Sequence, residues 1–378
     1  MKIIIAPDSF KGSLSAENVA KALKAGFYPY FPKATYHLIP MSDGGDGFLA
    51  AMLHNTTGQL YPINVTGPNN NQITATFATI DHGQTAVIET ASASGLELAT
   101  TKDPLHATSY GTGELIKAAL DLGVSKIILG LGGSATNDGG AGLLQALGLK
   151  LLDHDGNVLS FGGAALKNLA TIKTDAFDQR LQTTKIILAS DVIAPFIGPK
   201  GASFVFGPQK GASEKDVNAL DKALQHFAQV IYQTTQKDIT NVSGAGAAGG
   251  IAGGLLAFSH AQLQSGVSLM LEMTALSELA QGADLLLTGE GSLDAQTELG
   301  KAPLGVLQTV KKVAPNCLCC GIAGQIKDVA QLHELGFDAL FSCVPGVVTL
   351  TEALSATEQN LTQTATELAR FLKKAQNI

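Results

Sequence analysis

Short aliphatic runs alternate with helix-like segments at both ends of this sequence, and this alternation constrains the fold more than any other feature. Near the start, the run Ile3–Ala6 precedes a segment that Ser15 is suited to cap as a helix reaching about Phe27. Such alternation is typical of a parallel sheet with crossover helices. We therefore predict a sheet shared by both ends of the chain. Its expected strands are Ile3–Ala6, Tyr36–Pro40, Asp284–Thr288, Leu318–Ile322 and Ala339–Ser342, and its helices include Gly47–His54 and Thr351–Ala375.

The middle of the sequence follows a different pattern. Three short alternating runs, separated by "GPNNN" and "DHG", favour hairpins with antiparallel pairing; they are Leu60–Thr66, Ile73–Thr79 and Thr85–Thr90. Further on, helices are expected at Gly113–Leu122 and Glu214–Gln236, and strands at Lys126–Leu129 and Lys185–Ala189. The fold class predicted is α/β with two domains. Residues 1–65 and 282–378 form a discontinuous domain, and residues 66–281 form an inserted α/β domain with a mixed sheet.

Composition excludes several classes of protein. The chain has 378 residues and a net charge of −7, with no basic tract, so we expect neither DNA nor RNA as a partner. The N-terminus lacks a signal-peptide layout, and no apolar stretch is long enough to span a bilayer. A cytoplasmic protein that acts away from membranes is the prediction. Cys317 and Cys320 have C-x-x-C spacing, but their apolar surroundings favour buried, unreactive thiols.

Polar residues gather beside glycines where the predicted strands end. Ligands of open parallel sheets bind outside the carboxyl ends of the strands. The strand ends Ala6, Pro40, Leu129, Ala189 and Thr288 each lead into such a cluster. The clusters are "PDSFKGS", "PMSDGGDG", "GGSATNDGG", "ASDV" with "GPQKGAS", "TGEGSLDAQT" and "GKAP". Any one of them could simply cap a helix or hold a turn, but their agreement indicates a binding site.

The chemistry indicated is phosphate handling. Glycine allows several backbone N–H groups to converge on an oxyanion, so Gly130, Gly132 and Gly133 are expected to form an anion-binding nest, followed by a helix from Asn137 onward. Cations and carboxylates lie in the other clusters, and a site rich in both phosphate and carboxylate usually needs Mg²⁺. The candidates are Lys11, Lys210 and Lys301 for phosphate, and Asp43, Asp46, Asp191, Glu290 and Asp294 as carboxylates.

Three known nucleotide-binding or kinase motifs offer other interpretations. No G-x-x-x-x-G-K-[ST] is present, which argues against a P-loop protein. "GLGGSA" fits G-x-G-x-x-A, and Asp153 lies about 20 residues further on, as in a dinucleotide fingerprint. The same letters are similar to the GLGSSA loop of the small-molecule kinases that act on homoserine and galactose, in that one motif. These leave open an NAD(P)-dependent hydroxy-acid dehydrogenase and a non-catalytic metabolite-binding protein.

Taken together, the motifs resemble those of the bacterial glycerate kinases that phosphorylate D-glycerate with ATP. The resemblance runs from "IIIAPDSFKGSLSA" through "PMSDGGDG", "IETASASGL", "SYGTGELI", "GLGGSATNDGGAGLLQALG", "FGPQKGAS" and "GAGAAGG" to "TGEGSLDAQT" and "GKAP". It implies a Rossmann-like domain and an inserted domain with the active site between them. It also implies Mg²⁺ and ATP, with 2-phosphoglycerate favoured over 3-phosphoglycerate as product; a homodimer is compatible with it. Asp46, Phe48, Ser292 and Ala194 depart from the usual family pattern.

Residue roles follow as hypotheses for direct in-line phosphoryl transfer. Asp191 is the first choice for the base that deprotonates glycerate, Asp294 is the second, and Lys11 balances charge. The expected nucleotide contacts are Gly132, Gly133, Ser134, Thr136, Asn137, Lys210 and Glu290. The expected substrate contacts are Asp8, Ser9, Asp43, Asp46, Ser190 and Lys301, with Asp43 and Asp46 also holding Mg²⁺.

Overall fold

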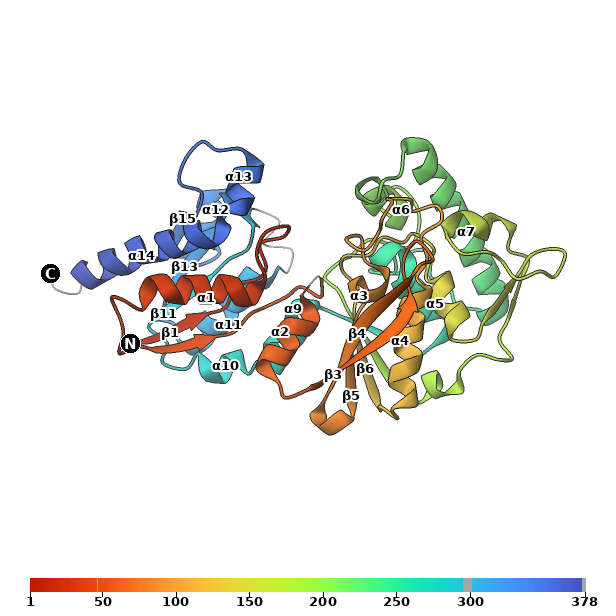
Figure 1. The fold of residues 1–378 in the computed structure, drawn as a ribbon, viewed down its shortest axis with the longest axis horizontal. Coiled ribbons are helices and arrows are strands. Elements are labelled where there is room, and N and C mark those ends of the chain that lie inside the picture. The colour runs from red at the N-terminus through yellow and green to blue at the C-terminus, as the bar shows by residue number, and fades with distance from the viewer. Residues whose placement is uncertain (46, 295–300, 376–378) are drawn as a thin grey trace. The chain divides into compact units, whose positions relative to one another are not determined.

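The structure is a computed structural model that describes residues 1–45, 47–294 and 301–375 (Figure 1). Contacts divide the chain into two compact units. The terminal unit comprises Met1–Asp43, Ala50–Thr56 and Ser265–Ile378, and the central unit comprises Gly44–Leu49 and Thr57–Gln264. Both are α/β, as the sequence predicts.

A five-stranded sheet forms the middle of the terminal unit, and all of its pairings are parallel. β1 lies between its two neighbours, with Ile5 opposite Leu38 on one side and Leu287 on the other. The prediction that both ends of the chain share one parallel sheet is therefore confirmed. Its strands, in spatial order, are β15 (Ala339–Ser342), β13 (Leu318–Ala323), β11 (Leu285–Thr288), β1 (Lys2–Ile5) and β2 (Thr35–Leu38).

Helices α1 (Ala16–Phe27) and α14 (Thr357–Ala375) pack side by side on one face of this sheet (Figure 1). Ser15 caps α1, as expected, by accepting a hydrogen bond from the Asn18 amide. The predicted single helix at Thr351–Ala375 is wrong, because a break at Ala356 separates α13 (Leu350–Ser355) from α14. The unit also contains α9 (Gly266–Met273), α10 (Leu276–Leu279), α11 (Ala302–Val313) and α12 (Val329–Glu334), with the short pair β12 (Ser292–Leu293) and β14 (Gln325–Ile326).

The central unit is built on a mixed six-stranded sheet. β3 and β4 pair antiparallel, as do β4 and β5, whereas the pairings from β5 through β6 and β9 to β10 are parallel. The predicted hairpins and mixed sheet are confirmed. In spatial order the strands are β10 (Gln262–Gln264), β9 (Lys185–Ala189), β6 (Lys126–Gly130), β5 (Thr85–Glu89), β4 (Gln72–Ile80) and β3 (Gln59–Thr66); β7 (Lys150–Leu152) and β8 (Thr171–Lys173) form a separate pair.

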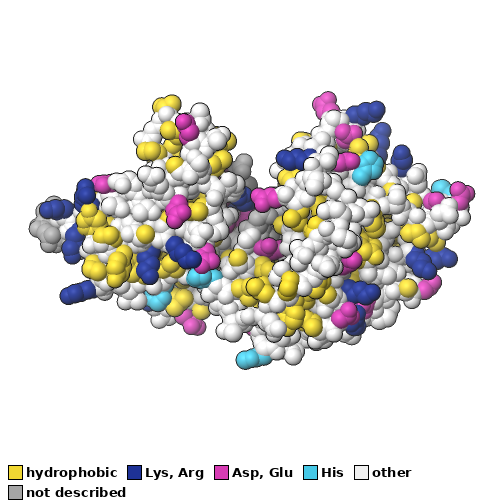
Figure 2. All heavy atoms as spheres, in the orientation of Figure 1, with side chains coloured by type: hydrophobic (Ala, Val, Ile, Leu, Met, Phe, Trp, Pro, Cys, Tyr) yellow, Lys and Arg dark blue, Asp and Glu magenta, His cyan; other side chains and the backbone are white. Residues whose placement is uncertain are grey.

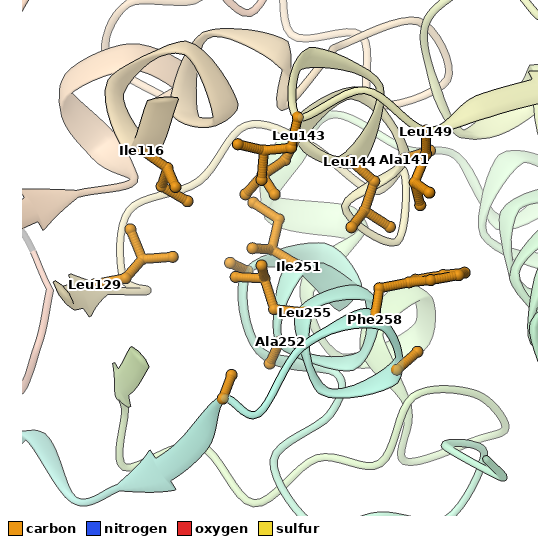
Figure 3. Packing of buried hydrophobic residues seen from close by; sticks show 14 of the residues in the cluster. Ile116, Leu129, Ala141, Leu143, Leu144, Leu149, Ile251, Ala252, Leu255 and Phe258 are labelled. Carbon is orange, nitrogen blue, oxygen red and sulfur yellow. The ribbon is translucent and has the colours of Figure 1, made fainter. Parts of the chain in front are cut away.

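Buried aliphatic side chains join the helices of the central unit to its sheet. In Figure 3, Leu143 and Leu144 of α5 (Ala141–Ala146) lie opposite Ile251 and Leu255 of α8 (Ile251–Phe258). The Gly/Ala-rich composition of α8 permits this approach, since a Cβ at Gly254 would lie 2.5 Å from the Gly139 carbonyl oxygen. The other helices are α3 (Ala91–Ser94), α4 (Tyr110–Asp121), α6 (Ala202–Phe206) and α7 (Glu214–Thr235). α2 (Phe48–Asn55) begins in the central unit, and its residues from Ala50 onward group with the terminal unit.

The boundaries of the compact units differ from the predicted domain boundaries at 65/66 and 281/282. β3 pairs with β4 along its whole length, so residues 57–66 group with the central unit. α9 and α10 pack with α11, which places the boundary before Ser265. Residues 44–49 also group with the central unit, where a Cβ at Gly44 would lie 2.6 Å from the Ala189 carbonyl oxygen.

Three predictions drawn from composition concern the cysteines, the surface charge and membrane-spanning helices. All four cysteines are free and buried, as expected. On the face drawn in Figure 2, Lys and Arg side chains lie scattered among Asp and Glu. None of the helices that the structure describes combines the length and the apolar character that a membrane crossing needs.

Candidate active site

The carboxyl edge of the terminal sheet gathers the acidic groups that the sequence places after its strands. Main-chain hydrogen bonds tie the segments after β1, β2 and β11 together. The Asp8 amide donates to the Gly289 oxygen at 2.8 Å, and the Met41 amide donates to the Pro7 oxygen at 2.9 Å. Predicted substrate-binding residues therefore meet at one edge of this sheet, as the rule for parallel sheets requires.

Asp8 is the most perturbed carboxyl of this cluster. Its side chain is buried, and burial together with the negative charges of Asp43 and Glu290 raises its pKa to about 8. The hydrogen bond of 2.6 Å from the Ser9 amide to Asp8 Oδ1 and the charge of Lys11 oppose this rise. Asp8 therefore keeps its proton to a higher pH than an ordinary aspartate, and a nearby cation would favour its ionised form.

Lys11 supplies the positive charge at this acidic edge. Its Nζ atom lies 3.3 Å from Asp43 Oδ2, and Asp43 raises the pKa of the Lys11 ammonium. Lys11 therefore stays charged while its side chain is 65% exposed, which leaves the ammonium within reach of a second anion. This placement is compatible with the charge-balancing role predicted for Lys11.

Lys301 lies between two other acidic residues of the terminal unit. Its Nζ atom is 3.2 Å from Glu290 Oε1 and 3.8 Å from Asp294 Oδ1. Burial raises the pKa of Glu290, and the charge of Lys301 opposes this. Glu290, Asp294 and Lys301 thus form one small cluster at the start of α11.

The oxygen-rich chemistry of this edge fits Mg²⁺, although no complete cage is present. Among the residues that the structure describes, no group of three or more side chains is arranged to hold a metal. Mg²⁺ is often held by one or two carboxylates plus phosphate and water oxygens, so a cage is not required. The mutual repulsion of Asp8 and Asp43 is the observation that favours a cation here. Asp46, the other predicted ligand, lies outside the described residues.

A second group of predicted residues meets at the carboxyl edge of the central sheet. Gly130 of β6 is the register partner of Ala189 of β9. Gly132 and Asp191 each follow these paired positions by two residues, and therefore lie at the same edge. Ser190 is fixed there as well, since its amide donates to the Gln264 oxygen at 3.0 Å. The predicted phosphate loop and the predicted base, Asp191, therefore follow the neighbouring strands β6 and β9 at the same edge of the sheet.

The loop after β6 differs in detail from the predicted nest. The amides of Leu131 and Gly132 donate to the oxygens of Ala189 and Gly44, so they cannot also hold a phosphate without breaking these bonds. The helix predicted from Asn137 begins at Ala141 instead, because Gly139 and Gly140 adopt positive φ values of 65° and 79° and form a turn.

Other amides of this loop have no internal acceptor. Within the described part of the chain, the N–H groups of Gly133, Ser134, Thr136 and Asn137 donate to no protein atom. Thr136 Oγ1 and Asn137 Oδ1 are also buried without a hydrogen-bond partner among the described residues. Unpaired amides beside a strand end can bind an anion, and these amides lie slightly later in the sequence than the predicted nest.

Lys210 lies beneath this loop rather than on its surface. Its side chain is buried, and Nζ donates to Ser134 Oγ at 2.8 Å and to the Thr136 oxygen at 2.7 Å. The predicted direct phosphate contact would require this ammonium to leave both acceptors.

Asp138 is a buried acid that the sequence reasoning did not select. Its Oδ2 atom accepts hydrogen bonds from the amide and hydroxyl of Ser109 and from the Gly142 amide, and its Oδ1 accepts from the Gly140 amide. It thereby joins the starts of α4 and α5. An acid directly before two glycines, as in "NDGG", was the available signal.

Comparison with known proteins identifies the family of this chain. The sequence model of the glycerate kinase family matches residues 3–373. The chain belongs to the glycerate kinase family. The glycerate kinase of Bacillus subtilis (strain 168) is 45% identical over 381 residues, which span 100% of this chain and 99% of that protein. A protein of Escherichia coli (strain K12) named glycerate 2-kinase is 46% identical over 375 residues, 98% of either chain.

A crystal structure from Salmonella typhimurium LT2, assigned as a glycerate kinase 2, has a TM-score of 0.84 to this chain, with 44% identity and full coverage of both. Membership of the family makes this chain a kinase. Of the four departures from the usual motifs, Asp46 lies outside the described residues. Phe48 is fully buried and its ring packs beside Gly130, while Ala194 is buried and Ser292 is half-buried.

Proposed function

We propose that this glycerate kinase transfers the γ-phosphoryl group of ATP to the C2 hydroxyl of D-glycerate, giving 2-phosphoglycerate and ADP. The observation that carries the proposal is the loop at residues 133–137, whose unpaired amides lie at the same sheet edge as Asp191. The name of the E. coli relative, glycerate 2-kinase, supports phosphorylation at O2.

In the proposed reaction, the loop amides receive the phosphate oxygens of ATP, beginning with Gly133 and Ser134. Fixed N–H dipoles stabilise the charge that spreads over these oxygens in the transition state. Thr136 and Asn137 are completely buried, so they shape the loop from its inner side and leave the direct contacts to Gly133 and Ser134. Glu290 takes part indirectly, through the position it gives Lys301.

Asp191 acts as the base for the acceptor hydroxyl, with Asp294 as the second candidate. As the C2 oxygen attacks the γ-phosphorus, the carboxylate takes the hydroxyl proton, and the bond between the γ-phosphorus and the β,γ-bridging oxygen breaks. The electron pair leaves with ADP. A carboxylate that only orients and deprotonates the nucleophile is sufficient for this loose transition state.

Residues of the terminal unit bind the acceptor and balance the charge. Lys301 pairs with the carboxylate of glycerate, and Lys11 neutralises phosphate charge. Asp8 and Ser9 hold the hydroxyl end of the substrate, with Ser190 contributing from the central unit. Asp43 would hold Mg²⁺, which would supply positive charge to neutralise the phosphates.

Phosphorus NMR of a mixture of ATP, Mg²⁺, D-glycerate and the protein tests the proposal in one measurement. Phosphate on O2 couples to a single proton and gives a doublet, whereas phosphate on O3 couples to two and gives a triplet. We expect the doublet, together with one ADP for each ester formed. A triplet would reassign the position, and ADP formation without an ester would refute the transfer to glycerate.

A further inference from the structure

Two ionisable side chains are buried in the central unit next to the loop at residues 130–142. Lys210 and Asp138 are both almost completely buried, and both direct their polar atoms into the loop. Buried charges are costly unless they are fully hydrogen-bonded, and most proteins avoid them. Their presence here therefore requires a role that an apolar side chain could not fill.

Lys210 fixes the first half of the loop. Its ammonium donates to the side chain of Ser134 and to the main chain of Thr136, which are two of the residues whose amides are unpaired. The backbone of Lys210 is itself held, since its amide donates to the Gly207 oxygen and the next residue, Gly211, has φ of +99° against the Lys102 main chain. The backbone from which the Lys210 side chain extends is therefore held in position.

Asp138 fixes the second half. It accepts four hydrogen bonds, two from Ser109 and one each from the amides of Gly140 and Gly142, at 2.8–3.2 Å. The Ser109 hydroxyl also accepts from the Leu143 amide at 2.9 Å. α5, which directly follows this turn, packs through Leu143 and Leu144 against α8 (Figure 3).

The loop is therefore held on both sides of its unpaired amides. Gly132 is anchored by the Gly44 oxygen, residues 134 and 136 by Lys210, and residues 140 and 142 by Asp138. Catalysis by backbone dipoles depends on their being oriented before the phosphate arrives. An anchor on either side supplies that orientation without touching the ligand.

We propose that Lys210 and Asp138 are positioning residues that preorganise the phosphate-binding amides of the loop, and that neither contacts ATP. This inference rests on the proposed function only in taking a phosphate as the ligand of the loop. It revises the predicted role of Lys210 from a direct phosphate contact to an internal support.

The pKa shifts of Lys210 and Asp138 are consistent with this positioning role. Burial lowers the pKa of Lys210 to about 7, and the negative charge of Asp138 opposes this change. Burial raises the pKa of Asp138, while the hydrogen bonds from Ser109, Gly142 and Gly140 oppose that rise. Even an uncharged Lys210 amine retains two N–H donors, so its bonds to the loop persist across neutral pH.

The substitution Lys210→Met removes the donors and keeps a side chain of similar length. We expect the KM for MgATP to rise about tenfold and kcat to fall about tenfold, because amides that move no longer match the transition state. The KM for D-glycerate should change less than twofold. Lys215→Met, which alters an exposed lysine at the start of α7, is the matched control and should resemble the wild type. Unchanged kinetics in Lys210→Met would overturn the proposal.

A double-mutant cycle separates support from direct contact. If Ser134 is positioned by Lys210, the effects of Ser134→Ala and Lys210→Met on the KM for MgATP should be strongly non-additive. Fully additive effects would mean that each residue meets the nucleotide independently, and would overturn the proposal. The cycle can still be read if Lys210→Met is less stable, provided that all variants are assayed below their melting temperatures.

Hydrogen exchange and calorimetry test the support without any turnover. In Asp138→Asn, amides of residues 131–142 and of the first turn of α4 should exchange faster, while those of the terminal sheet stay as in the wild type.

ADP binding, measured by calorimetry, should weaken about tenfold in Lys210→Met. If the wild type binds ADP but fails to phosphorylate D-glycerate, the proposed function fails and this inference stands. If ADP binding is unaffected by Lys210→Met, the inference fails instead.

Discussion

The Nζ atom of Lys11 lies 3.3 Å from Oδ2 of Asp43, and this ion pair links the segments that follow the first two strands of the chain. The same ammonium interacts electrostatically with Asp8 and Glu290. The positive charge of Lys11 is therefore shared among three carboxyl groups. Negative charge exceeds positive charge among these four residues, and measurements of protein stability can detect the consequences.

Asp8 should make the protein less stable as the pH rises from about 4 to about 8. Its folded pKa is raised to about 8, so over this range the native state binds a proton that the unfolded chain has released. The stabilisation is complete below the unfolded pKa and is lost as the pH passes through the folded value, with a slope of at most about 1.4 kcal/mol per pH unit. Chemical unfolding in EDTA measures this, and Asp8→Asn should reduce the slope, leaving the contributions of Glu290 and Asp138, whose pKa values burial also raises. An unchanged slope in Asp8→Asn would show that another group is responsible.

Added Mg²⁺ should reduce that slope in the wild type. A cation held near Asp43 favours the ionised form of Asp8 and so lowers its pKa. The comparison is unfolding at pH 8 with Mg²⁺ against EDTA, with Asp43→Asn as the variant in which the metal effect should disappear. Identical curves in Mg²⁺ and in EDTA would count against a metal at this edge.

Asp191→Asn should lower kcat by about 10²–10⁴-fold and change the KM for glycerate little. The amide keeps a hydrogen-bonding oxygen but cannot accept the hydroxyl proton, which is the usual loss on removing a general base. ADP release in a coupled assay gives both constants. Asp155→Asn replaces an exposed acid of the same unit and should behave as the wild type. Near-normal turnover in Asp191→Asn would transfer the role to Asp294.

Lys301→Met should raise the KM for D-glycerate about tenfold, because an ion pair of a carboxylate with a partly buried ammonium contributes about 1–2 kcal/mol to binding. The KM for MgATP should change less. Lys312→Met, an exposed lysine of α11, is the control. If the KM for MgATP rises instead, Lys301 binds the nucleotide rather than the acceptor.

Gly132→Ala should destabilise the protein by about 1–3 kcal/mol through overpacking and abolish most activity. A Cβ at this position would lie 2.2 Å from Gly45 Cα, so the segment at residues 44–45 or the loop must move. Gly346→Ala, whose Cβ would enter open space, should change the unfolding free energy by less than about 0.5 kcal/mol. Wild-type stability in Gly132→Ala would mean that the two segments separate freely.

Periodicity in the sequence predicts all five strands of the terminal sheet and five of the six in the central sheet. Aliphatic strands such as β6 and β9 are almost entirely buried, and their apolar runs identify them directly. β10, with the sequence Gln-Leu-Gln, carries no such signal, because it is short and pairs on one side only. The break at Ala356 was also missed, since Thr357 continues a helical pattern that only the tertiary fold interrupts.

At the candidate site, the sequence predicted which residues gather at the strand ends but not which way they face. Lysine between glutamine and glycine is typical of an exposed turn, and only the surrounding packing shows that Lys210 is buried. The role of Asp138 depends on Ser109, which lies 29 residues earlier in the sequence. Contacts of this kind follow from the assembled fold and not from local spacing.

The chain passes between its two compact units at residues 43/44, 49/50, 56/57 and 264/265. Neither unit is therefore a continuous piece that a gene fragment could encode by itself. Residues 44–49, of which Gly44 accepts the hydrogen bond of the Gly132 amide, are bounded on both sides by sequence of the other unit. Recombination or truncation that exchanges one unit between relatives would have to include this short segment, or Gly132 would lose its hydrogen-bond acceptor.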